Sequence, residues 1–489
     1  MPDSSRTSAW LPLVLLVGLG LRLYDLSGES LWLDEIVTGN RVHESLRNIL
    51  FGWDSETQGP IYYLWVKFWG LAFGTSEFSL RLWSVIFGTL TIAAIYRLGK
   101  QLFSNAAALL AALFLAVHPY AIHYSQEARP YALFLLFSVL SYSLLISLLR
   151  QHRWSVAWGF IFSAAGAFYT HVFGAFLILS HVLIYYLFRT SAKYRGAGRY
   201  PRPYFWTAVI LALICLPEFA QDALAGWEKI GGGGSATWIP VPTFLALIKL
   251  PLSYFLNPWA GLAIVPIVGV LALVRGLSEP RVRLGIWFLG IIALCFWVLP
   301  WIVSLTVTPL FVLRYTMPGL LVVVFLMAIA AASLQAMPRQ ILVIFLLGAT
   351  CWPLWDYYTK VDKDPWRQTA EYIAPRWQEG DVLIAMPQFT HSSAVWYFPA
   401  DVKASAPHVR SEADLQYALA RAERLWVVQS YEIKGEVRRR IADAAGSWGK
   451  EVQSSDVLSP QQVNPYATWI APIHVSLRER VSSDTTLIQ

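Results

Sequence analysis

The feature that most constrains this chain is a series of apolar runs with the length and composition of membrane-spanning helices. A helix needs about 20 apolar residues to cross a hydrocarbon core of roughly 30 Å. The 489 residues are 56% hydrophobic and 14% charged, whereas soluble domains carry roughly 25% charged residues. We therefore predict an all-α, polytopic membrane protein. Its eleven predicted spans lie at about 10–24, 79–98, 106–123, 130–149, 154–168, 171–188, 204–220, 259–275, 284–305, 311–334 and 339–355.

Basic residues between these runs indicate the orientation, because cytoplasmic loops are enriched in lysine and arginine. With a cytoplasmic N-terminus, the basic clusters at 97–100, 150–153, 189–202, 275–283 and 339 all fall inside. Counting the proline-interrupted run 241–256 as a span would put Arg275 outside. We expect this run to be an amphipathic helix on the outer face, within an outer loop 221–258 that also holds the glycine run 231–234. The net charge of +7 follows from the loop bias, so no nucleic-acid partner is expected.

The last part of the chain has a different composition. Residues 357–489 are charged, contain no span and alternate helical with strand-like patterns. The helical patterns lie at 365–378, 411–423 and 433–445, and the strand patterns at 381–386, 424–429 and 469–477. This alternation predicts a small α/β domain, which eleven crossings place outside the plasma (inner) membrane. The chain would then divide into a membrane module, 1–356, with its first outer loop at 25–78, and an extracytoplasmic domain, 357–489.

Charged residues at the outer ends of the predicted spans form the candidate site. Asp34 and Glu35 follow the first span, and Glu127 precedes the fourth. Four arginines lie at outer ends against the orientation rule: Arg22, Arg81, Arg129 and Arg314. Taken singly, the acids could cap a surface helix, and each arginine could reach lipid phosphate or a protein carboxylate. Ionisable groups at such positions are costly, and their convergence favours an anionic ligand bound through guanidinium groups.

Other candidates carry a weaker signal. Tyr62 and its neighbour Tyr63 could be interface aromatics or a platform for a sugar ring, and His171 could be a structural histidine or a ligand contact. His118 and His123 lack a third ligand at metal spacing, and the three cysteines show no CxxC pattern. The sequence therefore predicts neither a structural metal nor a disulfide framework.

Several stretches, taken in order, resemble a known enzyme family: the dolichyl-phosphate-mannose–protein mannosyltransferase-like glycosyltransferases, and in particular the bacterial integral-membrane enzymes of glycosyltransferase family 39. The stretches that carry this resemblance are SLWLDE, GPIYYLWVKFWG, SEFSLRLWSVIFGTLTIAAIYRLGKQLF, HPYAIHYSQEARPYALF, FYTHVFGAFLIL, FVLRYTMPGLL and KDPWRQTAEYI. The resemblance is dense over 10–190, moderate over 310–335 and loose in the C-terminal domain. Many relatives carry His-Pro-Pro where this chain has Gln58-Gly59-Pro60.

The resemblance implies a GT-C fold and an enzyme whose first outer loop holds the catalytic acid. The implied donor is a single sugar on a polyprenyl phosphate, transferred with inversion to a lipid, glycan or protein hydroxyl of the cell envelope. Asp34 would be the general base. The donor phosphate and sugar would contact Glu35, Arg22, Arg81, Tyr62, Glu127, Arg129, His171, Arg314 and Tyr315.

We expect no cofactor and no metal, although Asp34 with Glu35 could bind a divalent cation. Two alternatives remain at this stage. One is a transporter or flippase of lipid-linked saccharides, which the lack of an internal repeat weakens. The other is an oligosaccharide ligase or polymerase.

Overall fold

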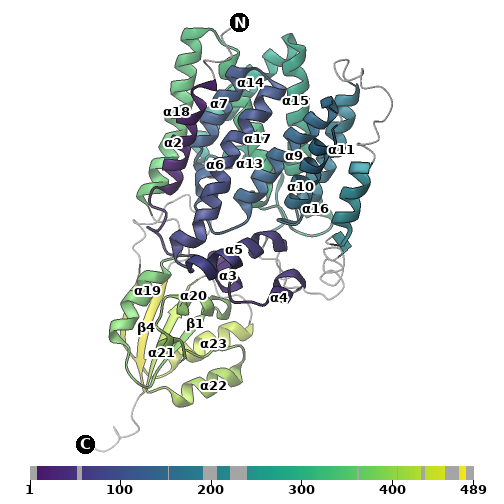
Figure 1. Cartoon of the computed structure of the whole chain (residues 1–489). Coiled ribbons are helices and arrows are strands. Elements are labelled where there is room, and N and C mark those ends of the chain that lie inside the picture. Colours follow the sequence, from purple (N-terminus) through teal and green to yellow (C-terminus); the bar gives the residue numbers. More distant parts are fainter. Residues whose placement is uncertain are drawn as a thin grey trace, which may run out of the picture. The chain divides into compact units, whose positions relative to one another are not determined.

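The computed structural model describes residues 8–51, 58–151, 153–190, 206–217, 219–220, 239–360, 363–404, 406–430, 436–457 and 473–480. These form two compact units (Figure 1). The membrane unit comprises Met1–Leu26 and Arg41–Asp356, and the composite unit comprises Ser27–Asn40 and Tyr357–Gln489. The segment that carries Asp34 and Glu35 therefore groups with the C-terminal part of the chain and not with the spans that flank it.

The membrane unit is a bundle of apolar helices that run side by side (Figure 1). Among the described residues, six helical segments are long and apolar enough to cross a membrane. They are α6 (Glu77–Leu102), α9 (Tyr131–Gln151), α14 (Pro258–Ser278), the continuous segment Pro280–Thr306 formed by α15 (Pro280–Ala293), η1 (Leu294–Val298) and α16 (Leu299–Thr306), the segment Leu313–Ala332 formed by η2 (Leu313–Gly319) and α17 (Leu320–Ala332), and α18 (Ala336–Thr359).

Shorter apolar helices complete this unit. A seventh candidate span is the pair α7 (Asn105–Val117) and α8 (Pro119–Ser125), which bends by 58°. The others are α2 (Leu11–Leu23), α10 (Trp154–Phe168), α11 (Gly174–Thr190), Trp206–Pro217 and α13 (Phe244–Ser253). Every predicted span coincides with one of these helices or segments, so the prediction of an all-α polytopic membrane protein is confirmed. The number eleven stays a prediction, because four of the helices at these positions are shorter than a full crossing.

The interrupted run 241–256 forms α13, a helix of ten residues with Pro251 inside it. Ten residues rise about 15 Å, which is half a bilayer core. This length agrees with the expectation that the run is not a span. The glycine run 231–234 predicted beside it lies outside the described residues.

Proline determines where the chain bends at α8. His118 has an extended backbone, with φ −71° and ψ 122°, and Pro119 is the first residue of α8. A residue before proline is driven away from helical geometry, and the proline lacks the N–H that would continue α7. The bend turns α8 out of the line of α7. Residues 123–129 lie at and just after the end of α8, beyond this bend.

The first predicted outer loop contains three helices: α3 (Leu33–Arg41), α4 (Leu46–Phe51) and α5 (Pro60–Phe73). The start of α5 is tied to the turn after α10, because the Gly59 N–H donates to the Thr170 carbonyl at 3.2 Å and the Ile61 N–H to the Tyr169 carbonyl at 3.3 Å. A Cβ at position 59 would lie 2.1 Å from the Tyr169 oxygen. Glycine is therefore required in the Gln58-Gly59-Pro60 sequence, where the backbones meet.

The composite unit contains a four-stranded mixed sheet with the strand order β1-β2-β4-β3. The strands are β1 (Asp381–Met386), β2 (Arg424–Gln429), β3 (Lys450–Asp456) and β4 (His474–Glu479). β1 and β2 are parallel, and β4 is antiparallel to both β2 and β3. The predicted α/β character of this region is confirmed. The strand β3 was not predicted, because six of its seven side chains are exposed and it has no apolar alternation.

Helices cover both faces of this sheet (Figure 1). Val382 and Ile384 of β1 and Leu425 of β2 pack with Leu415 of α22 (Glu412–Arg421) and Ala445 of α23 (Glu436–Ser447). The other face carries Trp426, whose ring approaches Tyr372. The helices α19 (Trp366–Ile373), α20 (His391–Trp396) and α21 (Ala400–Ala404), with the short turns η3 (Ala374–Arg376) and η4 (Gln388–Thr390), complete the unit.

Candidate active site

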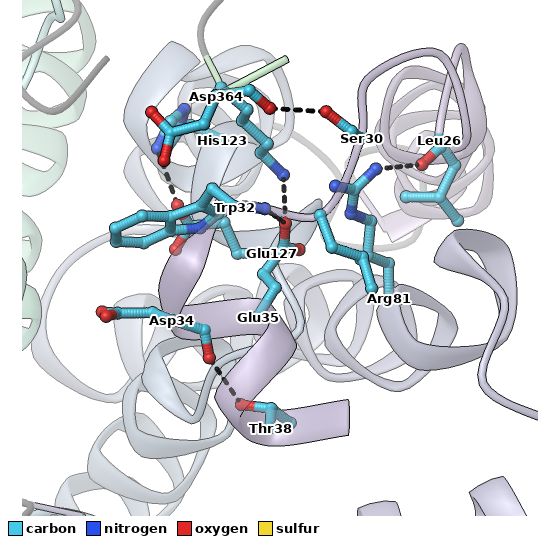
Figure 2. A network of polar contacts seen from close by, with 12 residues as sticks. Leu26, Ser30, Trp32, Asp34, Glu35, Thr38, Arg81, His123, Glu127 and Asp364 are labelled. Carbon is cyan, nitrogen blue, oxygen red and sulfur yellow. Dashed lines mark hydrogen bonds and ion pairs between the residues drawn. The ribbon is translucent and has the colours of Figure 1, made fainter. Parts of the chain in front are cut away.

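The two adjacent acids lie in the first turn of α3 and have different surroundings. Successive helical residues are rotated by about 100°, and Figure 2 shows the Asp34 and Glu35 side chains pointing in different directions. Glu35 is fully buried, and its Oε2 accepts from Lys363 Nζ at 3.2 Å and from the Trp32 backbone N–H at 3.4 Å. Asp34 is half-buried. Burial therefore favours an anchoring role for Glu35 and leaves Asp34 as the more accessible acid.

Within the membrane unit, a second group of polar residues gathers after the bend at α8. His123 Nε2 lies 3.2 Å from Glu127 Oε1, one helical turn further on, and the Glu127 side chain is 4% exposed. Arg129 Nη1 donates to the Tyr63 hydroxyl at 3.5 Å, and that hydroxyl donates to Gln58 Oε1 at 2.9 Å. These contacts link residues 123–129 with the start of α5, where Gly59 permits the close approach.

His171 lies in the turn between α10 and α11, outside both helices, and is fully buried. Its Nδ1 accepts the Phe173 backbone N–H at 3.2 Å. In the neutral ring the proton therefore belongs to Nε2. Burial, followed by the guanidinium groups of Arg129 and Arg314, lowers the pKa of His171 to about 3. Among the described residues nothing accepts a hydrogen bond from Nε2, so the cluster contains one buried neutral donor available to a ligand.

Arg314 and Tyr315 come from η2, at the start of the segment that leads into α17. The Arg314 guanidinium carbon lies 5.7 Å from the centre of the Tyr315 ring, and this ring lies 4.9 Å from His171. Both Arg129 and Arg314 influence His171, so the two cations share one neighbourhood. The structure thus brings together five residues that were predicted from distant parts of the sequence: Glu127, Arg129, His171, Arg314 and Tyr315.

Further aromatic residues line the same cluster, and two of them, Tyr124 and Tyr131, were not predicted. The Tyr131 ring lies 5.1 Å from Tyr124 and 5.8 Å from His171. The contact with Arg129 comes from Tyr63, while the predicted Tyr62 is fully buried beside it. The spacing of tyrosines around Glu127 and Arg129 was the available signal, but it does not say which rings face the charges.

Arg22 and Arg81, which were also predicted to contact the donor, make hydrogen bonds to protein oxygens. Arg22 is fully buried in α2 and donates to the Ser125 hydroxyl at 3.1 Å and to the carbonyls of Gly18, Ala116 and Leu115 at 2.9, 2.9 and 3.2 Å. Arg81 donates to the Leu26 carbonyl at 2.9 Å (Figure 2). Contacts with neutral protein oxygens favour a structural role for Arg22 and tie Arg81 to the chain that leaves α2. A donor contact for either residue stays a prediction.

Within the part of the chain that the structure describes, no three histidine, cysteine or acidic side chains are placed to hold one ion.

The similarities to known proteins agree with this geometry. Residues 58–219 match the family model described as dolichyl-phosphate-mannose-protein mannosyltransferase. The solved structure of ArnT from Cupriavidus metallidurans bound to undecaprenyl phosphate has a TM-score of 0.57 at 13% identity, covering 97% of this chain and 99% of that one. Its apo structure gives 0.56 at 14% identity, covering 96% and 98%. A comparison with curated proteins gives no match.

At these identities the likeness to ArnT shows the fold, which is that of the GT-C glycosyltransferases. The family model matches about a third of the chain, and that third contains Tyr62, Glu127, Arg129 and His171. The predicted resemblance and the predicted multi-pass membrane fold are confirmed, and the matching family model and the structural neighbours are those of glycosyltransferases, the predicted enzyme class.

Proposed function

We propose that this protein is an inverting glycosyltransferase that takes a single sugar from a polyprenyl-phosphate donor. The observation that carries the proposal is the pair of cations Arg129 and Arg314 around the neutral, buried His171. Guanidinium groups bind phosphate oxygens through charge-assisted hydrogen bonds. The two guanidinium groups share this neighbourhood with one carboxylate, that of Glu127, so these three side chains carry a net positive charge that favours an anion. A phosphodiester on a lipid carrier supplies such an anion at the membrane. ArnT, whose fold the chain shares, has been solved with undecaprenyl phosphate bound.

The proposed chemistry needs one base and a stabilised leaving group. Asp34 takes the proton from an acceptor hydroxyl while the hydroxyl oxygen attacks the anomeric carbon. The bond between that carbon and the phosphate oxygen breaks, so the polyprenyl phosphate leaves and the anomeric configuration inverts. Arg129 and Arg314 stabilise the negative charge on the leaving phosphate. Phosphate leaves as an anion, so the step uses no general acid, and we propose no metal or other cofactor.

The acceptor and the side of the membrane belong to the same proposal. A donor carried on a lipid suits a site that nucleotide sugars in the cytoplasm do not reach. We propose an active site and a C-terminal domain on the outer face of the inner membrane, with a hydroxyl of an envelope glycolipid, polysaccharide or protein as acceptor. The basic loops on the opposite side support this orientation.

The experiment is a transfer assay with the purified full-length protein in liposomes. A panel of undecaprenyl-phosphate monosaccharides is offered with total envelope lipids, and products are read by mass spectrometry. Wild type should consume one donor, and Asp34→Asn should be slower by at least about 100-fold, because a positioned general base contributes roughly 10²–10⁴-fold. Asp25→Asn is the matched control, since Asp25 is exposed and lies outside the proposed site.

Three other results would contradict the proposal in different ways. Normal turnover by Asp34→Asn would remove Asp34 as the base. Transfer of a preassembled oligosaccharide instead of one sugar would indicate a ligase or polymerase. Movement of the lipid-linked sugar across the bilayer without any new glycosidic bond would indicate a flippase.

A further inference from the structure

The composite unit joins two stretches of chain that are more than 300 residues apart, and a short segment after α18 makes most of the connections. This clamp segment is Lys363–Arg367. Its residues contact the segment 27–40, which carries Asp34, through side chains and backbone. Both stretches belong to the composite unit, so these contacts hold residues 27–40 against the C-terminal part of the same unit.

Two of the contacts fix the chain just before α3. The Ser30 hydroxyl donates to the Asp364 carbonyl at 2.5 Å, and both residues are buried (Figure 2). The Arg367 guanidinium donates to the carbonyls of Ser27, at 3.2 Å, and Gly28. The hydroxyl of Tyr397, the residue after α20, accepts the Leu31 backbone N–H at 2.6 Å. The C-terminal part of the chain therefore holds four residues before Asp34 by hydrogen bonds: Ser27, Gly28, Ser30 and Leu31.

The third contact fixes α3 itself. Lys363 Nζ lies 3.2 Å from Glu35 Oε2, and the two side chains are 4% and 0% exposed. A buried ion pair contributes little net stability, but it holds its partners in one geometry and is costly to break from one side. Glu35 is the residue next to Asp34, so any rotation of α3 that swings Asp34 would also pull Glu35 away from Lys363.

We propose that Lys363 is a positioning residue for the transfer reaction: through Glu35 it fixes the orientation of α3 and thereby the direction of the Asp34 carboxylate. The inference rests on the proposed role of Asp34. It gives the C-terminal domain a part in catalysis that does not require it to touch a substrate. A misplacement of about 1 Å in a catalytic group costs roughly 100-fold in rate, so a loosened α3 should lower kcat while leaving the binding of the donor unchanged.

The test compares Lys363→Met, which keeps the length of the side chain and removes its charge, with Lys363→Arg, which keeps the charge. Lys403→Met is the matched control, because Lys403 is exposed on α21 of the same unit. The first measurement is hydrogen exchange of the full-length protein. We expect amides of residues 30–38 to exchange at least tenfold faster in Lys363→Met, with those of β1 unchanged, and protection to return in Lys363→Arg. Unchanged exchange at 30–38 would overturn the proposal.

The second measurement is steady-state kinetics with the undecaprenyl-phosphate sugar that wild type consumes. Lys363→Met should lower kcat by at least tenfold and leave the KM for that donor within twofold, and Lys363→Arg should recover most of the rate. A kcat within threefold of wild type, or a change confined to KM, would overturn the proposal. An inactive Asp34→Asn with an unaffected Lys363→Met rejects only the positioning role, whereas an active Asp34→Asn rejects the proposed function.

Two further variants cover the case in which Lys363→Met fails to fold. Tyr397→Phe removes the acceptor for the Leu31 N–H and leaves the Lys363–Glu35 pair in place, and it should lower kcat in the same direction by a smaller factor. The double variant Glu35→Gln with Lys363→Met removes both charges of the pair. If Glu35 and Lys363 act only through each other, the kcat of the double variant should equal that of the slower single variant, and the two losses should not multiply. Multiplied losses would contradict coupling through the pair.

Discussion

Two buried arginine sites in the membrane unit look alike in the sequence and differ in the structure. Arg22 donates to one hydroxyl and three backbone carbonyls, all of them neutral. Arg314 lies in the same neighbourhood as a second guanidinium, that of Arg129, around a neutral histidine. A cation that donates several hydrogen bonds to neutral protein oxygens holds helices together. Two neighbouring cations beside an unused N–H donor favour an anionic ligand.

The hydrogen bonds of Arg22 join three helices. Its acceptors belong to α2, to the end of α7 and to α8, and Gly88 of α6 leaves room for it, because a Cβ there would lie 2.0 Å from Ser125 Oγ and 3.1 Å from Arg22 Nε. Close approach at small residues is the usual way in which membrane helices pack. Burial of a charge in a membrane protein therefore identifies a function only after the partners of that charge are known.

The largest effect that we predict comes from removing the Arg22 guanidinium. Arg22→Met should lower the free energy of unfolding by about 3 kcal/mol or more, because hydrogen bonds to a charged group are worth roughly 1.5–3 kcal/mol and several acceptors lose their donor. The measurement is the thermal midpoint and the yield of the detergent-purified protein. Arg97→Met, at an exposed position of α6, is the control and should change neither. If Arg22→Met were stable but bound the donor poorly, Arg22 would be assigned to the donor site and not to the contacts between helices.

The sequence could not distinguish these two arginines because the difference lies in long-range partners. Apolar runs were enough to place the helices, and the buried strands 381–386 and 424–429 were predicted with the bounds that the structure has, because each is a compact apolar run between turn signals. The acceptors of Arg22 lie about a hundred residues away, at Leu115, Ala116 and Ser125. No local pattern encodes that proximity.

The same limit applies to the acids and to β3. Asp34 and Glu35 are adjacent and chemically similar. Glu35 is distinguished as the anchored acid by its contact with Lys363, which lies 328 residues further along the chain. The strand Lys450–Asp456 is an exposed edge held by backbone hydrogen bonds to β4, so its side chains carry no periodic signal. Tertiary partners, and not propensity, decide each of these cases.

The second prediction tests the other arginine site. Arg314→Met should raise the KM for the undecaprenyl-phosphate donor by about 10- to 100-fold, since a charge-assisted hydrogen bond is worth roughly 1.5–3 kcal/mol and 1.4 kcal/mol is tenfold in affinity. The thermal midpoint should fall less than it does in Arg22→Met. The measurements are donor-dependent kinetics and thermal unfolding on the same preparations. A donor KM like that of wild type would take Arg314 out of the phosphate site and would remove the contrast with Arg22.

The smallest effect concerns His171, the neutral donor near the two cations. His171→Phe keeps an aromatic ring and removes the Nε2–H, so kcat/KM should fall by about 2- to 10-fold, the value of one neutral hydrogen bond of roughly 0.5–1.5 kcal/mol. The pH profile makes this test sharper. Because the pKa of His171 is lowered to about 3, the ring is neutral throughout pH 5–8, and protonation would begin only as the pH falls toward 3. The ratio of wild-type to variant rates should therefore be constant across that range. A ratio that changes with a midpoint near 6.5 would mean that His171 is protonated in the working enzyme, and the anion would then be held by three cations instead of two cations and a neutral donor.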